Sequence, residues 1–306
     1  MRQVAGLLAM GVMAFAAAGV PFAKLEADFR TQREQSLTKP DGWLAVAGLF
    51  WLHDGAMTLG SDPQSDVVLS ASAPKRAGIL HMQGGVVTFE PAAGAGVLID
   101  GKPAAKMALK PDTDAHTNIV QAGKITLTII KRGDRTGVRM RNPDATTRQS
   151  FTGCKWFPAL EAWRVNAKWV PYPTPKKIKI TNILGMTDEE PSPGYAEFTV
   201  QGKTLRLEPV ADDDGSLSFM FKDLTSGKTT YAPGRFLDSD KPQGGHVVLD
   251  FNQAYNPPCA FTAFATCPLP PKQNTLPIAV EAGEMKYGPH PSLAPPVLTP
   301  PGGGSR

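Results

Sequence analysis

Residues 56–70 read AMTLGSDPQSDVVLS, which is two short apolar runs separated by a polar turn. Ala56–Leu59 and Val67–Leu69 are too short for helices, and the Gly, Asp and Pro residues between them are typical of turns. The same alternation of run and turn continues to residue 141, with further strands expected at Gly78–Met82, Val86–Glu90, Val97–Ile99, Ile119–Gln121, Ile125–Lys131 and Gly137–Arg141. This spacing predicts an antiparallel β-sandwich over residues 45–141.

The sequence on either side of this segment also predicts its structure. Leu25 and Phe29 share a face at helical spacing, so a helix is expected in residues 24–44. Residues 142–287 have almost no helical periodicity and predict a second antiparallel β unit, with strands at Lys176–Asn182, Tyr195–Val200, Lys203–Pro209, Leu217–Lys222, Thr229–Tyr231, His246–Asp250 and Ile278–Ala282. The Pro- and Gly-rich residues 288–306 are expected to be disordered. The predicted fold class is therefore all-β.

The composition agrees with this fold class and argues against one class of partner, nucleic acids. The 30 Gly and 29 Pro residues among 306 favour short strands joined by many turns. A net charge of +4 with 20% charged residues lacks the concentrated basic face of a nucleic-acid-binding protein, so no nucleic acid partner is expected.

The first 23 residues predict export. Arg2 precedes an apolar run from Val4 to Val20 that ends in small residues, the pattern of a cleaved signal peptide. An uncleaved anchor is the alternative, although the run is short for a stable membrane span. No later segment is long and apolar enough to span a bilayer, so a periplasmic or secreted protein without a stable membrane span after cleavage is expected.

The cysteines and histidines bear on redox and metal chemistry. In an oxidising compartment Cys259 and Cys267 could form a disulfide, which would leave Cys154 without a partner. The five histidines are scattered through the chain without a short His or Cys pairing, so neither a metal site nor a cofactor is predicted.

The order of turns and strands in residues 45–141 resembles the forkhead-associated β-sandwich, some members of which read phosphothreonine. The resemblance rests on Leu59-Gly60-Ser61, Ser65–Leu69 and Leu98–Lys102. Phosphopeptide-reading members carry an Arg where this chain has Ser61, and a Ser and His pair near the region Ser72–Lys75. Without an arginine to bind a phosphate in bidentate fashion, phosphothreonine binding is not expected.

Two segments carry the candidate functional residues. Residues 142–175 hold Trp156, Trp163 and Trp169, a density that predicts packing at the seam between the two halves and that could also form a stacking platform beside Arg164. The second segment is 249–271, in which the Pro-rich part from Asn256 to Pro271 must form an irregular, rigid loop held by short polar side chains.

The second segment also carries a family resemblance. The run Asp250–Phe261 around Asn256-Pro257-Pro258-Cys259, together with Gly234-Arg235-Phe236 and Gly48–Leu52, resembles the DUF1684 family over residues 30–285. The resemblance implies that these segments belong together in one fold. It implies no activity, because the family has no assigned function.

Two functions remain open from the sequence. The first is binding of a small-molecule ligand in a pocket at the seam, lined by residues of both segments and by two residues between them: Trp156, Trp163, Arg164, Tyr231, Arg235, Asn252, Tyr255 and Asn256. The second is hydrolysis by the paired carboxylates Asp250 and Glu284, or less readily by Cys259 as a nucleophile. A structural ion pair between Arg235 and Asp250 is the competing interpretation of those two residues.

Overall fold

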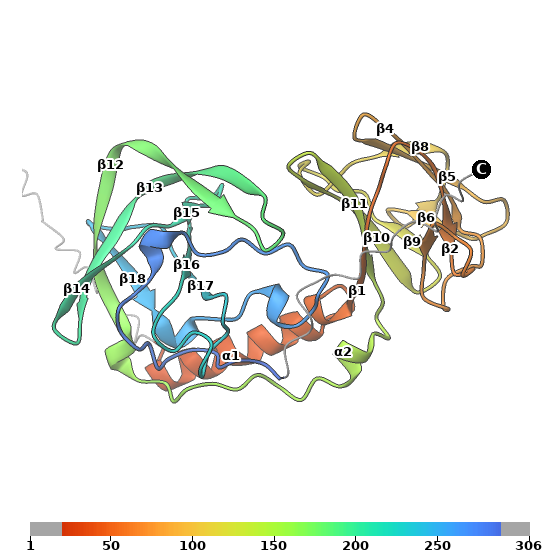
Figure 1. Cartoon of the computed structure of the whole chain (residues 1–306). Coiled ribbons are helices and arrows are strands. Elements are labelled where there is room, and N and C mark those ends of the chain that lie inside the picture. The colour runs from red at the N-terminus through yellow and green to blue at the C-terminus, as the bar shows by residue number, and fades with distance from the viewer. Residues whose placement is uncertain (1–19, 289–306) are drawn as a thin grey trace, which may run out of the picture.

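The computed structural model describes residues 20–288, so most of the predicted signal peptide and nearly all of the predicted tail lie outside the described residues. Within that range the protein is mostly β, with one long helix, α1 (Phe22–Thr38). The strands form two units that lie side by side, and α1 runs beneath the larger one (Figure 1). The prediction of an all-β fold behind an N-terminal helix is therefore confirmed.

The first unit is the predicted sandwich, made of two sheets. One sheet has the order β1-β11-β10-β9-β6-β7 and the other β3-β2-β4-β5-β8. The pairs are antiparallel except for β2 with β3. The strands are β1 (Val46–Trp51), β2 (Gly55–Gly60), β3 (Val67–Val68), β4 (Gly78–Gln83), β5 (Val86–Pro91), β6 (Leu98–Ile99), β7 (Lys102–Pro103), β8 (Met107–Leu109), β9 (Val120–Ala122), β10 (Ile125–Arg132) and β11 (Arg135–Arg141).

Every second side chain along these strands points into the sandwich core. Leu127 and Ile129 of β10 point inward and pack with Phe89 of β5, which has no exposed surface. The intervening residues face the other side of the sheet because successive side chains on a strand alternate. This regular two-faced pattern explains why the sequence predicted this unit well.

The second unit also contains two sheets, and its core lies between them. Their orders are β14-β13-β12-β18 and β15-β16-β17. Phe219 and Leu237 from the smaller sheet pack with Phe198 and Leu249 from the larger one. The strands are β12 (Arg164–Thr181), β13 (Thr187–Val200), β14 (Lys203–Leu207), β15 (Val210–Ala211), β16 (Leu217–Phe221), β17 (Arg235–Ser239) and β18 (His246–Asp250).

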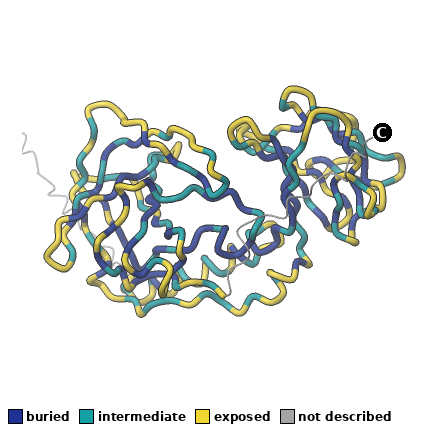
Figure 2. The backbone as a smooth tube through the Cα atoms, in the orientation of Figure 1, coloured by how far each residue is buried: buried dark blue, intermediate teal, exposed yellow. Residues whose placement is uncertain are grey.

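The remaining elements are short and lie in the connections. A one-turn helix, α2 (Thr146–Gln149), follows the sandwich. The single-turn 3-10 helices are η1 (Trp43–Ala45), η2 (Glu161–Trp163), η3 (Phe251–Gln253), η4 (Pro258–Ala260) and η5 (Lys272–Asn274). The last three lie in the chain that follows β18 and contains the Pro-rich loop, which is largely buried although it has no strand (Figure 2).

Several predicted elements are corrected by the structure. Thr229–Tyr231 is a turn rather than a strand, because the amides of Thr229 and Thr230 both donate to the Thr225 carbonyl. Ile278–Ala282 is not a strand either, since the carbonyls of Val280 and Ala282 accept hydrogen bonds from the Arg235 side chain. The long strand β12 begins at Arg164, inside the segment that the sequence suggested was a connection.

The seam between the units is held by the loop after η4. Thr262 donates to the Val46 carbonyl at the start of β1, at 3.2 Å. Arg132 of β10 donates to the Thr266 hydroxyl at 3.0 Å. A small apolar cluster containing Leu37, Leu44 and Phe261 fills the space beside these contacts. The Pro-rich loop therefore lies at the junction of α1, the sandwich and the second unit.

Candidate functional site

The candidate site is a groove of about 510 Å³ in the second unit. It lies between the hairpin β12–β13 and the outer face of the sheet β15–β17. Five strands, the turn after β15 and the chain after β18 contribute to it. The lining residues are Ile180, Glu190, Val210, Ala211, Asp212, Asp213, Ser218, Met220, Phe236, Tyr255 and Pro268.

The floor of the groove is apolar. Ile178 and Ile180 of β12 pack against Met220 of β16, and Phe236 of β17 joins them. The Tyr255 ring meets Phe236 edge to face, with ring centroids 5.8 Å apart. Met220 and Phe236 lie on the outer face because their strand neighbours, on the opposite face, fill the core of the unit.

The side of the groove carries a chain of hydrogen bonds between acidic and hydroxyl groups. The Tyr255 hydroxyl donates to Asp238 Oδ2 at 2.7 Å. The Ser218 hydroxyl lies 2.9 Å from Asp238 Oδ1 and 3.2 Å from Asp212 Oδ2. Ser218 and Asp238 are direct partners in the β16–β17 ladder, so the sheet itself sets their distance. One hydroxyl therefore stands between two carboxylates.

Both the ring and the main chain of Tyr255 are held in place. The Arg33 guanidinium of α1 lies 4.6 Å from the ring centroid. The main-chain amide and carbonyl of Tyr255 pair with those of Phe236 at 2.9 Å. Burial, followed by the nearby Asp238 carboxylate, raises the pKa of the Tyr255 hydroxyl far above its ordinary value, so the hydroxyl remains a donor at neutral pH.

This arrangement suits a ligand with a cationic group and an apolar body. The groove is acidic. Its lining includes Glu190, Asp212 and Asp213 but no Lys or Arg, and Asp238 is bonded to the lining residue Ser218. Apolar pockets with a few convergent polar groups are the usual form of a small-molecule site. An ammonium or guanidinium group would add the positive charge that the serine and tyrosine hydroxyls cannot supply to these carboxylates.

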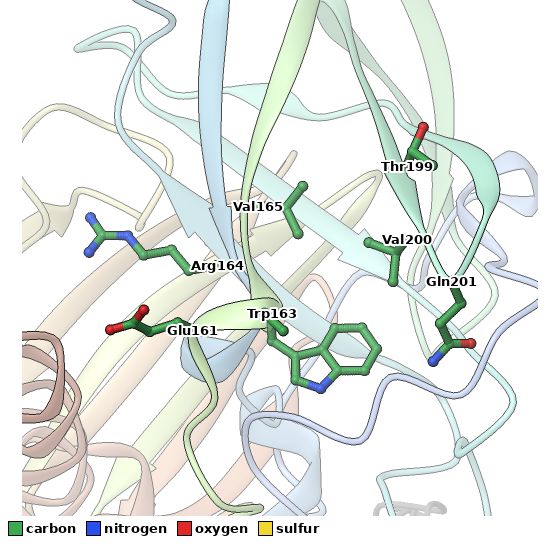
Figure 3. A pocket seen from close by; sticks show the side chains of 8 residues that line it. Glu161, Trp163, Arg164, Val165, Thr199, Val200 and Gln201 are labelled. Atoms are coloured by element: carbon green, nitrogen blue, oxygen red, sulfur yellow. The ribbon is translucent and has the colours of Figure 1, made fainter.

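Of the residues predicted to bind a ligand, Tyr255 lines this groove. Trp163 and Arg164 line a different, open depression of about 540 Å³ at the start of β12. There the two side chains point in opposite directions, and the indole lies toward Val200 and Gln201 (Figure 3). The indole packs on Phe251 in the core, with centroids 6.1 Å apart. The predicted stacking platform of Trp163 beside Arg164 is therefore not formed.

Four other predicted ligand residues serve the fold at separate places. Trp156 packs against Phe29 and under the Arg30 guanidinium of α1. Tyr231 is buried beside Cys259 and Cys267. The remaining two are asparagines of the Pro-rich loop that bond to main-chain groups, Asn252 to Leu160 and Asn256 to Met285.

Arg235 and Glu284 are buried in separate ion pairs. Arg235 is 1% exposed and donates to Asp223 Oδ2 at 2.9 Å, so the predicted pair with Asp250 is wrong. Glu284 has no exposed surface. One of its oxygens accepts a hydrogen bond from Arg33 Nε at 2.8 Å, and the other accepts one from the main-chain amide of Asn256 at 2.7 Å. Both side chains therefore hold the loop from within.

The predicted catalytic groups are not brought together. Asp250 bonds to Asn252 in its own turn and lies 3.6 Å from Arg164, whereas Glu284 pairs with Arg33. Neither carboxylate is among the residues that line the groove. The main-chain amide of Cys259 donates to Cys267 Sγ, and its thiol has no histidine among its contacts within residues 20–288. These contacts provide no cleft in which both carboxylates could face a substrate.

Three residues of the site were not predicted from the sequence: Ser218 and Phe236, which line the groove, and Asp238, which bonds to Ser218 and Tyr255. A signal was present, because Leu217, Phe219 and Phe221 alternate with Ser218 and Met220 along β16. Such alternation predicts that Ser218 faces away from the core. The acidic run 212–214 before this strand is the second part of that signal.

Residues 20–288 contain neither a candidate metal cluster nor a candidate membrane-spanning helix. In this part of the chain no three His, Cys, Asp or Glu side chains gather in a set that could hold a metal ion. None of the helices described there combines the length and the apolar character needed to cross a bilayer.

Comparison with known proteins adds a family and two structures. Residues 149–285 match the family described as protein of unknown function, DUF1684. A solution NMR structure of an uncharacterized protein from Haloarcula marismortui is 31% identical, covering 45% of this chain and 78% of that chain with a TM-score of 0.38. The FHA domain of FhaA, crystallised in a complex, is 12% identical and covers 30% of this chain and 97% of its own, with a TM-score of 0.22. No curated protein matches the sequence.

Proposed function

We propose that this chain, which belongs to the DUF1684 family of proteins of unknown function, is an exported protein that binds a small cationic molecule. The ligand would have an ammonium or guanidinium group attached to an apolar or aromatic body. The binding site would be the groove between the hairpin β12–β13 and the sheet β15–β17.

The single observation that carries this proposal is the position of the Ser218 hydroxyl between Asp212 and Asp238. A serine hydroxyl has one hydrogen and can donate to one carboxylate at a time. The Tyr255 hydroxyl also donates to Asp238, and the Ser216 hydroxyl lies 3.2 Å from Asp212 Oδ2. An ionised carboxylate can accept about four hydrogen bonds, so both side chains keep acceptor capacity at the edge of the apolar floor. A ligand cation would bond to both and neutralise their mutual repulsion.

The floor supports the same ligand class. Phe236 and Tyr255 offer aromatic surface next to the carboxylates, and Met220 adds a flexible apolar contact. A charged hydrogen bond contributes roughly 1.5–3 kcal/mol, so a neutral analogue of the same shape is expected to bind about tenfold to a hundredfold more weakly.

Export is the second part of the proposal. It is supported by the charged start and the apolar run Val4–Val20 of the sequence. The test is the mass of the mature protein recovered from the periplasm or the medium. A mass that lacks the first 23 residues or so supports cleavage and export, whereas recovery of the full-length chain in the cytoplasm contradicts it.

The binding proposal is tested by calorimetric titration with matched probes. An arylalkyl ammonium ion should bind, and the alcohol and the carboxylate of the same skeleton should bind at least about tenfold more weakly. Asp238→Asn should weaken ammonium binding by a similar factor, because it removes one of the two charges beside Ser218.

Glu161→Gln is the matched control. It also removes one negative charge, but it lies at the Trp163 depression rather than the groove. Equal weakening by Asp238→Asn and Glu161→Gln would show that only the net charge matters. Equal affinity for the ammonium and carboxylate probes would overturn the proposed ligand class.

A further inference from the structure

Cys259 and Cys267 face each other in the Pro-rich loop, outside the groove. The Cys259 amide donates to Cys267 Sγ at 3.2 Å, and the Cys267 amide donates to Cys259 Sγ at 3.3 Å. The two thiols are not bonded to each other in the structure. Each sulfur thus lies against the main chain of the other cysteine.

Arg139 of β11 supplies a buried positive charge at the same place. It is 4% exposed. Within residues 20–288 its Nε has no hydrogen-bond partner, and its one hydrogen bond there is a 3.4 Å contact with the Thr266 hydroxyl. Its guanidinium lies 5.1 Å from the centroid of the Trp43 ring. Among the ion pairs of residues 20–288, none joins Arg139 to a carboxylate, although its neighbour Arg132 pairs with Asp112.

A buried guanidinium without a carboxylate is costly unless another anion is near. Burial first, and then the neighbours Arg132 and Arg141, lowers the pKa of Arg139 to about 10. Arg139 therefore still carries its charge at neutral pH. The anionic or ionisable groups near Arg139 are the Asp112 carboxylate, which is already paired with Arg132, and the sulfur atoms of Cys267 and Cys259.

We propose that Cys259 and Cys267 form a reversible dithiol–disulfide pair, with Arg139 as the counter-ion of the reduced form. In the reduced protein Cys259 is the thiol that ionises first, because its sulfur accepts hydrogen bonds from the Cys267 thiol and the Cys267 main-chain amide and lies near the positive charge of Arg139. In the oxidised protein the two sulfurs are bonded and this negative charge is absent.

The chemistry is thiol–disulfide exchange with a low-molecular-weight disulfide such as oxidised glutathione. The Cys259 thiolate attacks one sulfur of that disulfide, which forms a mixed disulfide and releases one thiolate. The Cys267 sulfur, after losing its proton, then attacks Cys259 Sγ and releases the second thiolate. The balance is one protein dithiol and one disulfide converted into one protein disulfide and two thiols.

The pKa directions agree with these roles. A hydrogen bond from the Cys267 thiol is the main cause that lowers the pKa of Cys259, and Arg139 contributes. Burial raises the pKa of Cys267. The other ionisable group at the pair is Tyr231, whose pKa is raised far above its ordinary value, mainly by burial. Burial also raises the pKa of the separate Cys154 thiol, so this residue is not expected to ionise at neutral pH.

The pair also lies next to the hairpin β12–β13 and the groove. The Cys267 carbonyl accepts from the Ile183 amide at the tip of the hairpin β12–β13, at 2.9 Å. The next residue, Pro268, lines the groove. The proposal does not depend on ligand binding there, because it rests on the sulfur pair and Arg139 alone.

The first test is a redox equilibrium of the full-length protein. Samples are equilibrated in glutathione buffers of increasing oxidised fraction, quenched with acid, alkylated under denaturing conditions and analysed by mass spectrometry. The expected result is three alkylated cysteines in reducing buffer and one, Cys154, in oxidising buffer, with full reversal by added reduced glutathione. Three free thiols at every ratio, or a bond that involves Cys154, would overturn the pair.

The second test measures the role of Arg139 with a control on the same strand. Arg139→Gln should raise the equilibrium constant for oxidation by about tenfold or more, because it removes the counter-ion of the thiolate. Arg135→Gln should leave that constant unchanged, since Arg135 is exposed and packs on the Trp51 ring. The same constant in Arg139→Gln and the wild type would overturn the counter-ion role.

An independent readout covers the case in which Arg139→Gln folds poorly. The ultraviolet absorbance of thiolate is followed against pH in the reduced wild type and in Cys259→Ser. A thiolate that persists below the ordinary cysteine pKa of about 8.5 in the wild type and disappears in Cys259→Ser supports the proposal. Absorbance that rises only above that pH in both proteins contradicts it.

Discussion

Single polar side chains hold the irregular part of the second unit. The chain after β18 has no ladder to satisfy its main-chain groups, and buried groups of this kind must be paired. Asn274, which has no exposed surface, accepts from the Glu208 amide and donates to the carbonyls of Glu208 and Met220. Arg235 does the same for the carbonyls of Val280 and Ala282. Side chains thus replace the hydrogen bonds that a strand would have provided.

Two glycines allow the tightness of this loop to be measured. Gly283 and Gly101 have nearly the same backbone conformation, with φ of +76° and +77°. A Cβ on Gly283 would lie 2.3 Å from the Ala254 carbonyl oxygen, whereas a Cβ on Gly101 would have no heavy atom within 4 Å. Gly101→Ala should therefore lose about 1 kcal/mol of unfolding free energy for the backbone alone.

Gly283→Ala should lose a further ~1–3 kcal/mol, because the loop must shift to admit the methyl group. Urea unfolding of both variants and the wild type measures the difference. Equal losses in the two variants would show that the loop around Gly283 adapts freely.

Helix α1 is attached mainly through polar groups. Its buried residues are Glu26 and Leu37. Arg30 donates to the Phe157 carbonyl at 2.9 Å, and Arg33 donates to Glu284 and to the Asn256 carbonyl, both at 2.8 Å. A helix held in this way depends on the charge state of its contacts, and this makes its docking dependent on pH.

Glu26 gives the clearest pH prediction for this element. Burial raises its pKa from 4.5, the nearby Asp250 raises it further, and Gln253 and Arg30 oppose the rise. In the folded protein Glu26 therefore keeps its proton over a range in which the unfolded chain has lost it. Its contribution to stability is full below pH 4.5, decreases as the pH rises through the folded pKa, and is constant above it.

Glu26→Gln removes this titration and keeps a polar amide in place. The unfolding free energy of the variant, minus that of the wild type, should increase with pH above about 4.5, by roughly 1.4 kcal/mol for each unit of raised pKa. Urea unfolding from pH 4 to about 8 measures it, with exposed Glu161→Gln as control. A difference that is flat with pH would contradict the raised pKa of Glu26.

At the scale of the whole molecule, the two units have separate cores. The sandwich core includes Phe89 and the second core includes Phe219, and neither ring has any exposed surface. The contacts between the units are a small apolar cluster and hydrogen bonds such as that from Thr262 to Val46. An interface of this kind is expected to transmit destabilisation weakly.

Matched deletions of the two rings test this independence. Phe89→Ala should destabilise the sandwich by about 3–5 kcal/mol and raise amide hydrogen exchange in β4, β5 and β10. Exchange in β16 and β17 should stay as in the wild type. Phe219→Ala should produce the opposite distribution. Exchange that rises throughout the protein in both variants would show that the units unfold as one.

Much of the fold was predictable from local patterns. The alternation in Ile125–Lys131 and Val86–Glu90 predicted strands close to β10 and β5. A strand with one face in a core has apolar residues at every second position, and this pattern is visible in the sequence. The failures occurred at Thr229–Tyr231 and Ile278–Ala282, where apolar residues are buried without a ladder. Burial makes a segment apolar whether or not it is a strand, so hydrophobicity alone could not separate these cases.

The site was less predictable, and the reason is the distance along the chain between its parts. The sequence alone determined that Tyr255, Asn256 and Cys259 belong to a rigid Pro-rich loop, because proline limits the backbone wherever it occurs. Which groups those residues meet was decided only by the tertiary structure: Asp223 rather than Asp250 for Arg235, and Arg139 beside the two cysteines. Periodicity gives the face on which a side chain lies, but the partner across that face depends on how separate sheets pack, and no local rule contains that information.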